Sequence, residues 1–130
     1  NIIINVGPGE TGNFTAVTTS TFDSGSDTLT IIGSTGGETI LGSNIQATIS
    51  GNGGNDNITG GNSADIINGN NGNDTIDGND GADTLTGGSG DDVYVFNTND
   101  VDTGETIVEA VGGGTDTVSI VTAVDFSSMN

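Results

Sequence analysis

The chain has 130 residues, 18 of which are Asp or Glu, and it contains no Lys, Arg, His or Cys. A net charge of −18 without a basic side chain excludes direct binding to nucleic-acid phosphates or to anionic membranes. Without His and Cys, zinc and copper sites are disfavoured and an all-oxygen site for Ca²⁺ remains, the alternative being an acidic surface that serves solubility. With 24 glycines and 30% hydrophobic residues, the chain cannot form an ordinary packed core, and we expect one module excised from a longer protein.

The first segment, residues 1–32, is irregular and rich in residues that favour β-strands. The apolar run Ile2-Ile3-Ile4 and the later Phe14 and Ala16 predict strands. Residues 22–30, FDSGSDTLT, are a candidate for a further copy of the repeat that follows, with Asp27 in its acidic place and Ile31-Ile32 as an insertion. We therefore expect a β-rich N-terminal flank.

Residues 33–95 divide into seven nonapeptides: GSTGGETIL, GSNIQATIS, GNGGNDNIT, GGNSADIIN, GNNGNDTID, GNDGADTLT and GGSGDDVYV. Glycine opens all seven. The sixth place holds an acid in every copy except the second, which has Ala47; these acids are Glu38, Asp56, Asp65, Asp74, Asp83 and Asp92. The eighth place is large and apolar throughout: Ile40, Ile49, Ile58, Ile67, Ile76, Leu85 and Tyr94. Three columns that stay in phase over seven copies indicate a solenoid.

Each nonapeptide predicts a tight loop followed by a short strand. Gly and Asn tolerate positive φ in the first four places, and the last residues alternate polar, apolar and polar. Two nonapeptides with opposite strand directions make one coil, so the acids fall into two columns, Glu38–Asp56–Asp74–Asp92 and Asp65–Asp83. Carboxylates stacked about 4.8 Å apart repel by roughly 3–4 kcal/mol at an effective dielectric of 20. Calcium between the loops reverses the sign of that interaction.

The pattern closely resembles the RTX (repeats-in-toxin, haemolysin-type) nonapeptide G-G-x-G-x-D-x-U-x, which residues 51–95 match in five copies and residues 33–50 match in degenerate form. The resemblance implies an all-β fold, a right-handed parallel β-roll, with several Ca²⁺ ions between stacked loops. It implies as ligands the acids of the sixth place, together with main-chain carbonyls of the first four places: Gly51, Asn52, Gly53, Gly54, Gly60, Gly61, Asn62, Ser63, Gly69, Asn70, Asn71, Gly72, Gly78, Asn79, Asp80, Gly81, Gly87, Gly88, Ser89 and Gly90.

The chain departs from the family pattern in several places. Ser63 replaces the fourth glycine, and Asn replaces the second glycine in three copies; we expect little effect, because carbonyls rather than side chains bind. Ala47 and Ile45 predict that the loop of residues 42–50 binds no metal. Within the array Asp74 is predicted to serve the loops on both sides, and Asp92, at the array end, only one.

The remaining segment, residues 96–130, is predicted to be a capping or linker β segment. The strand Val93–Phe96 is expected to plug the end of the roll. Glu105 and Asp116 repeat the acid-x-apolar spacing, but we favour solvated turn acids over metal ligands at both positions. The side chains of Asp77, Asp80 and Asp91 fall outside the acid columns and are expected to be solvated.

Other interpretations of the repeat are weaker. The Asn-Gly pairs are hairpin signals, but a hairpin meander would not keep the acids in phase. No window has the ligand spacing of an EF-hand, and an ice-binding threonine ladder would be broken by Asn57, Ile66 and Val93. The usual general bases and activated nucleophiles are missing, so we expect no enzyme activity.

Two functions remain open. The first is an extracellular calcium-binding structural module of a bacterial cell surface, such as a segment of a surface-layer, filament or adhesin subunit, which folds and self-associates on binding Ca²⁺. The alternative is the C-terminal export and folding module of a secreted enzyme or toxin. For both, the resemblance implies type I secretion and folding in extracellular calcium.

Overall fold

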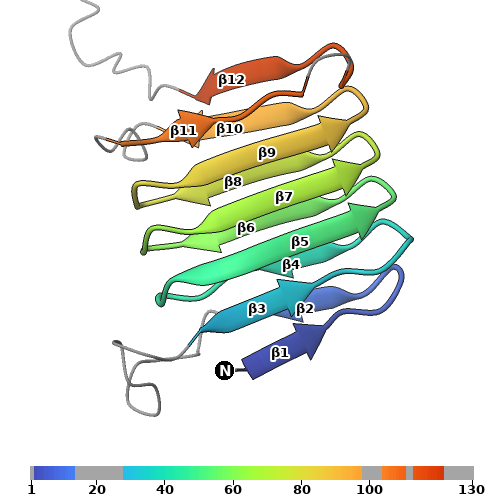
Figure 1. Cartoon of the computed structure of the whole chain (residues 1–130), viewed down its shortest axis with the longest axis vertical. Helices are drawn as coiled ribbons and strands as arrows, with labels where there is room; N and C mark the ends of the chain where they lie inside the picture. The colour runs from blue at the N-terminus through green and yellow to red at the C-terminus, as the bar shows by residue number, and fades with distance from the viewer. Residues whose placement is uncertain (1, 14–27, 98–103, 111–112, 122–130) are drawn as a thin grey trace, which may run out of the picture.

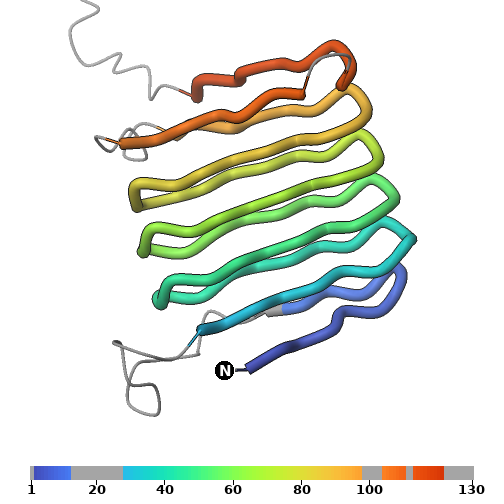
Figure 2. The backbone as a smooth tube through the Cα atoms, viewed as in Figure 1, coloured from blue at the N-terminus to red at the C-terminus, as the bar shows by residue number. Residues whose placement is uncertain are grey.

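A computed structural model describes residues 2–13, 28–97, 104–110 and 113–121. In these residues the chain forms strands, turns and loops without a helix, and therefore without a helix that could cross a membrane. The strands wind in a right-handed sense about one axis, as the colours from blue to red show (Figures 1 and 2). The predicted all-β, parallel β-roll is confirmed.

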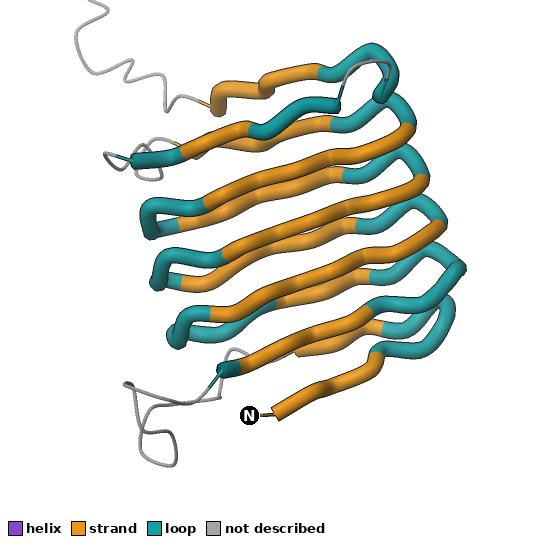
Figure 3. The backbone as a smooth tube through the Cα atoms, viewed as in Figure 1, coloured by secondary structure: helices purple, strands orange, loops and turns teal. Residues whose placement is uncertain are grey.

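In the described part of the chain, two parallel sheets form the two walls of the roll, each with six strands. The first sheet contains the odd-numbered strands in order: β1 (Ile2–Asn5), β3 (Leu29–Ile32), β5 (Ala47–Gly53), β7 (Ile66–Asn71), β9 (Thr84–Ser89) and β11 (Thr106–Ile107). The second contains the even-numbered strands: β2 (Thr11–Asn13), β4 (Thr39–Leu41), β6 (Asn57–Gly61), β8 (Thr75–Asn79), β10 (Val93–Asn97) and β12 (Thr117–Val121). Loops connect the walls along both edges (Figure 3).

The register reproduces the predicted coil of two nonapeptides. Ile40 pairs with Ile58 and Ile58 with Ile76 in one wall, and Ile49 pairs with Ile67 in the other. Because the repeat has the same length in every central coil, residues of the same place stack directly on one another. A column of acids or of isoleucines in the sequence thus becomes a column in space.

The core is a thin double ladder of the eighth-place residues. All seven are buried, with exposed fractions of 0–1%. Leu29 and Ile31 extend the ladder toward the N-terminus, and Phe96 and Ile107 pack against it toward the C-terminus. Burial of each such side chain stabilises the fold by about 1.5–3 kcal/mol. The core is only two side chains wide, however, so the loops at the two edges need other interactions to stabilise them.

Strands of both flanks continue the same two sheets. β1 pairs with β3 and β2 with β4, as expected for β-strands in residues 1–32, while β11 pairs with β9 and β12 with β10. The strand β10 lies between β8 and β12, so the prediction that Val93–Phe96 ends the roll is wrong: a further coil follows it.

The predicted copy at residues 22–30 has a different register. Leu29 pairs with Ala47, which stands in the sixth place of its nonapeptide, so Leu29 and not Asp27 occupies the acidic place of this coil. Ile31 pairs with Ile49 and is therefore the core residue of this coil. Ile31-Ile32 is therefore part of β3 and not an insertion. Asp27 itself, like Phe14 and Ala16, lies outside the described residues.

Candidate metal sites

Four acids form a buried column along one edge of the roll, which we call the first edge and define by residues 33–38, 51–56, 69–74, 87–92 and 113–116. Glu38, Asp56, Asp74 and Asp92 have exposed fractions of 1–3%. The main-chain N–H of each of the first three acids donates to the Oδ1 atom of the acid one coil further on, with N···O distances of 2.7, 2.8 and 2.8 Å. The predicted column at a spacing of 18 residues is therefore present.

In three acids of this column, the second carboxylate oxygen lacks a hydrogen-bond donor. The Oδ2 atoms of Asp56, Asp74 and Asp92 are buried and have no hydrogen-bond partner. An ionised carboxylate in that position is costly unless a positive charge compensates it. Since the chain has no basic side chain, only a bound cation can supply that charge.

Main-chain carbonyls approach the same oxygens. A Cβ atom added to Gly69 would lie 2.7 Å from the carbonyl oxygen of Gly87 in the next coil and would collide with Oδ2 of Asp74. Gly51 stands in the same relation to Asp56 and to the carbonyl of Gly69. Glycine in the first place is thus what allows a carboxylate oxygen and a carbonyl oxygen from adjacent coils to meet.

The first-edge loops need residues that accept positive φ. Asn52 and Asn70 in the second place have φ values of 76° and 80°, and Gly54, Gly72 and Gly90 in the fourth place have 94°, 129° and 124°. Asparagine is one of the few residues with a side chain that tolerates this region. The substitution of Gly by Asn in the second place is therefore compatible with the loop geometry, as predicted.

The opposite edge, which we call the second edge and define by residues 42–47, 60–65, 78–83 and 104–105, carries a shorter acid column. The N–H of Ala47 donates to Oδ1 of Asp65 at 2.7 Å, and the N–H of Asp65 donates to Oδ1 of Asp83 at 2.7 Å. The other oxygen of Asp65 accepts from the N–H of Gly61 at 2.9 Å. Both Asp65 oxygens are therefore hydrogen-bonded, unlike those of Asp56, Asp74 and Asp92.

The loop of residues 60–65 also has a different backbone. Neither Gly61 nor Ser63 has positive φ, whereas Asn79 and Gly81, at the same places of the next loop, have 63° and 144°. The Ser63 hydroxyl donates to the carbonyl of Asn44 at 3.0 Å. The loop of residues 60–65 therefore differs in conformation from the loop of residues 78–83, and the expectation that Ser63 has little effect on metal binding stays a prediction.

Burial raises the pKa of four acids in the two columns, Asp56, Asp65, Asp74 and Asp92. The pKa of Asp56 rises to about 6 from an ordinary 3.8, because burial opposes the charge more than the Glu38 N–H supports it, and Asp74 and Glu38 add repulsion. Burial likewise raises the pKa of Asp65 to about 6, against its hydrogen bonds from Ala47 and Gly61. The pKa values of Asp74 and Asp92 are also raised, mainly by burial. Without a cation, these carboxylates resist ionisation.

Two acids that we expected to be solvated continue the columns. The N–H of Asp92 donates to Oδ1 of Asp116 at 3.0 Å, and the N–H of Asp83 donates to Oε2 of Glu105 at 3.0 Å. Both side chains are partly buried. Their offsets of 24 and 22 residues, instead of 18, hide them from a search at fixed period.

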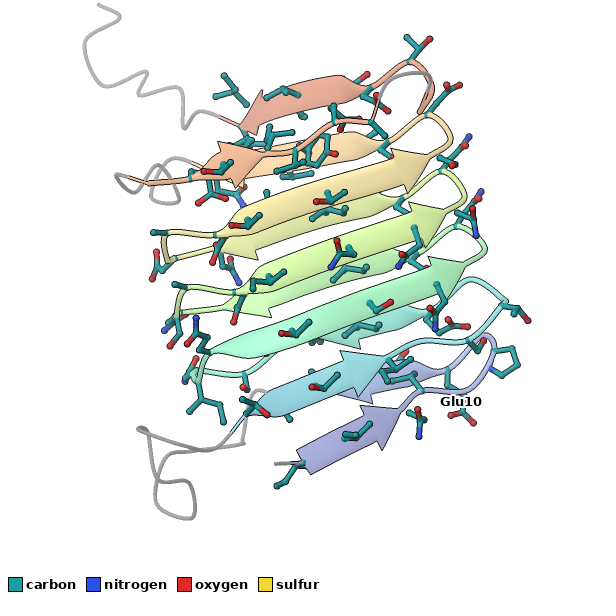
Figure 4. The ribbon with its side chains drawn as sticks, in the orientation of Figure 1. Glu10 is labelled. Carbon is teal, nitrogen blue, oxygen red and sulfur yellow. The ribbon has the colours of Figure 1, made fainter. Side chains whose placement is uncertain are left out.

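Glu10 was missed altogether. It precedes β2 as Glu38 precedes β4, because Thr11 pairs with Thr39, and the N–H of Thr39 donates to its carbonyl at 3.1 Å. Figure 4 shows Glu10 in the loop that joins β1 and β2. The repeated Gly-Glu-Thr string at residues 9–11, 37–39 and 104–106 was the available signal. The Glu10 side chain is exposed and accepts from the N–H of Gly7 at 3.2 Å.

The side chains of Asp77, Asp80 and Asp91, which were predicted to be solvated, differ in their surroundings. Asp80 is exposed, as expected. Asp77 is tied into the sheet, accepting from the N–H of Asn79 at 3.0 Å and from the Asn97 amide at 2.9 Å. Asp91 is exposed but accepts from the N–H of Thr115 in the last coil at 2.8 Å.

Carboxylates alone do not make a metal centre here. Among residues 2–13, 28–97, 104–110 and 113–121, no three acidic side chains converge on a point. We therefore expect carbonyl oxygens as the remaining ligands, and the predicted carbonyl residues of the first four places do lie at the two edges. The ligand assignments of individual carbonyls stay predictions.

The comparison with protein families agrees with this geometry. The family described as RTX calcium-binding nonapeptide repeat (4 copies) matches residues 47–76 and 59–94. Residues 47–94 therefore carry RTX calcium-binding nonapeptide repeats, and these repeats within a β-roll indicate a calcium-binding module. No curated protein and no solved structure matches the chain.

Proposed function

We propose that this chain is an extracellular structural module whose β-roll is held together by Ca²⁺ ions between stacked loops, and that it has no catalytic role. The observation that carries the proposal is the set of buried Oδ2 atoms on Asp56, Asp74 and Asp92, which have no hydrogen-bond partner in a chain without basic residues. Calcium takes carboxylate and carbonyl oxygens in flexible geometry, which fits both donor types at these loops.

The proposed ion positions lie between successive loops of each edge. On the first edge, Asp56 and Asp74 supply carboxylate oxygens next to the first-place carbonyls of the following coils. On the second edge, Asp83 has the corresponding place, and Asp65 is the weaker ligand because Gly61 already binds its oxygen. Glu38 is the first-edge ligand nearest the N-terminus, although its oxygens also accept hydrogen bonds from the Ser34 N–H and hydroxyl, both at 2.8 Å.

The calcium concentration outside cells supports folding after export. Extracellular calcium modules bind with dissociation constants of about 10⁻⁴–10⁻³ M. Such sites are empty at cytosolic calcium levels and fill outside, where ligand binding shifts the equilibrium toward the folded state. The same property suits the second candidate, the folding and export module of a type I-secreted bacterial enzyme or toxin.

Exposed apolar residues at both ends of the roll favour the structural role. Ile2 and Ile3 of β1 are 45% and 66% exposed, and Ile120 of β12 is 68% exposed. The outer edges of β1 and β12 carry main-chain groups that could pair with another copy, and open parallel edges are sites of association. Self-association into a surface layer or filament would cover these residues.

Electron microscopy of the purified chain with chelator and with millimolar calcium tests the role. We expect ordered arrays or filaments that form with calcium and dissolve with chelator. Monodisperse, calcium-folded monomers at all concentrations would overturn the structural assignment and favour the export module.

A further inference from the structure

The C-terminal loop of residues 113–116 stacks on the last nonapeptide loop as if it were part of the repeat. The N–H of Thr115 donates to Asp91 Oδ1 at 2.8 Å, just as the N–H of Asp91 donates to the Asn73 side chain at 3.0 Å. The N–H of Asp92 donates to Asp116 Oδ1 at 3.0 Å in the neighbouring ladder. Two ladders thus pass from the repeat into a segment outside the family match, which ends at residue 94.

The glycines of this loop take their usual places too. The N–H of Gly90 donates to the carbonyl of Gly113 at 2.6 Å, as the N–H of Gly72 donates to that of Ser89 at 2.8 Å. A Cβ on Gly114, which has a φ of 158°, would collide with the carbonyl oxygen of Gly90. The close approach of the two loops, which calcium between loops requires, is therefore kept.

An oxygen without a hydrogen-bond partner lies at this last interface. Asp92 is 1% exposed and its Oδ2 has no hydrogen-bond partner. One coil earlier, the carbonyl oxygen of Gly87 lies next to Gly69. At Gly87 the corresponding oxygen is the hydroxyl of Tyr94, which lies 2.7 Å from the position of a Cβ added to Gly87. That hydroxyl accepts from the N–H of Gly87 at 2.5 Å and donates to Glu109.

We propose that the interface between residues 87–92 and 113–116 holds a further Ca²⁺ ion, with Asp92 and Asp116 as its carboxylates. Tyr94 lies where the next coil would otherwise present a first-place carbonyl, and it closes the site at that end. This proposal rests on the proposed calcium binding and adds a site that the nonapeptide period does not encode. It makes the C-terminal coil a calcium-held cap of the roll.

Tb³⁺ substitution provides a test specific to this position. Tb³⁺ binds oxygen sites of the kind that Ca²⁺ occupies, and an aromatic side chain close to it sensitises its luminescence. Tyr94 is the only Tyr and the chain has no Trp, so the sensitised emission comes chiefly from the ion nearest Tyr94. In the wild-type chain we expect strong emission that excess Ca²⁺ displaces.

The diagnostic variant is Asp116→Asn, which keeps an acceptor for the Asp92 N–H and removes the charge. We expect the Tb³⁺ concentration for half-maximal sensitised emission to rise roughly ten- to a hundredfold and the calcium count by equilibrium dialysis to fall by about one ion. Asp91→Asn is the matched control in the adjoining ladder and should change neither value. Asp65→Asn, on the second edge, should lower the count and leave the emission.

Gly114→Ala is a second route to the same site, because its Cβ separates the two loops without changing the charge. It should reduce the emission as Asp116→Asn does, while circular dichroism in calcium shows the central coils still folded. Wild-type emission and ion count in both variants would overturn the terminal site and leave the proposed function intact. A wild-type chain that binds neither Ca²⁺ nor Tb³⁺ would overturn both.

Discussion

The two edges of the roll are built from the same nonapeptide but differ in how far their acid columns run. On the first edge, the column passes from Glu38 through Asp56, Asp74 and Asp92 to Asp116. On the second edge, the places that precede Asp65 hold Leu29 and Ala47, which are both buried and apolar.

The difference teaches how much of the repeat is needed for metal binding and how much for folding. The β-strands and the isoleucine ladder continue through coils whose edge carries no acid, so hydrophobic packing and main-chain hydrogen bonds suffice there. Where acids stack, the packing brings like charges together, and a bound cation offsets their repulsion when the acids are ionised. We therefore expect the demand for calcium to be concentrated on the first edge.

The largest expected effect is a difference in the loss of stability between one substitution on the first edge and one on the second edge. Asp74→Asn should weaken two sites, since Asp74 has neighbouring acids in both adjoining coils, whereas Asp65→Asn should weaken one. At about 10 mM Ca²⁺ each site contributes roughly 1.4–2.7 kcal/mol. Thermal melting in calcium should show about twice the loss of stability for Asp74→Asn.

Asp92→Asn refines that experiment. Because Asp116 follows Asp92, we now expect its loss to match that of Asp74→Asn rather than to be half of it, as the repeat alone predicts. Equal losses for the Asp65 and Asp74 variants would contradict the difference between the edges.

Acid pH should replace part of the calcium. The folded-state pKa values of Asp56 and Asp65, both about 6, lie above the ordinary 3.8. Their neutral forms therefore favour the fold fully below about pH 4, and this contribution is lost as the pH rises through about 6. Circular dichroism in chelator should show more β-structure near pH 4.5 than near pH 7.5; the opposite order would show that buried charge does not oppose folding.

A smaller change in stability is expected when an acid is placed at residue 47, the position in the second column that holds Ala. Ala47→Asp buries a carboxylate at a place that is 3% exposed, next to a loop in which Ile45 replaces the fourth-place glycine. The variant should lose about 1–3 kcal/mol of stability without binding an additional ion, as calorimetric titration can check. A gain of one calcium ion would show that the acid alone, without the glycine loop, defines a site.

The sequence contains most of the central architecture. A constant period places identical positions above one another, so Ile58, Ile67 and Ile76 had to form the core and Asp56, Asp74 and Asp92 a column. The tolerance of asparagine for positive φ followed from the same reasoning at Asn52 and Asn70. These features depend on local geometry repeated without change.

The terminal coils could not be predicted in this way. Hydrogen-bond ladders join Asp92 to Asp116 and Asp83 to Glu105 regardless of how many residues separate them, and a fixed period does not detect a coil of different length. The conformation of the loop around Ser63 was missed for another reason. Its polar contacts, from Ser63 to Asn44 and from Gly61 to Asp65, depend on side chains brought together by folding.

The most direct test of the account is the unfolding of the whole chain near pH 7.5, followed by circular dichroism in millimolar calcium and in excess chelator. We predict a cooperative transition with strong β-signal in calcium, and a largely unfolded chain once the ions are removed. The same cooperative melting in chelator as in calcium would contradict the claim that cations between the loops hold the coils together.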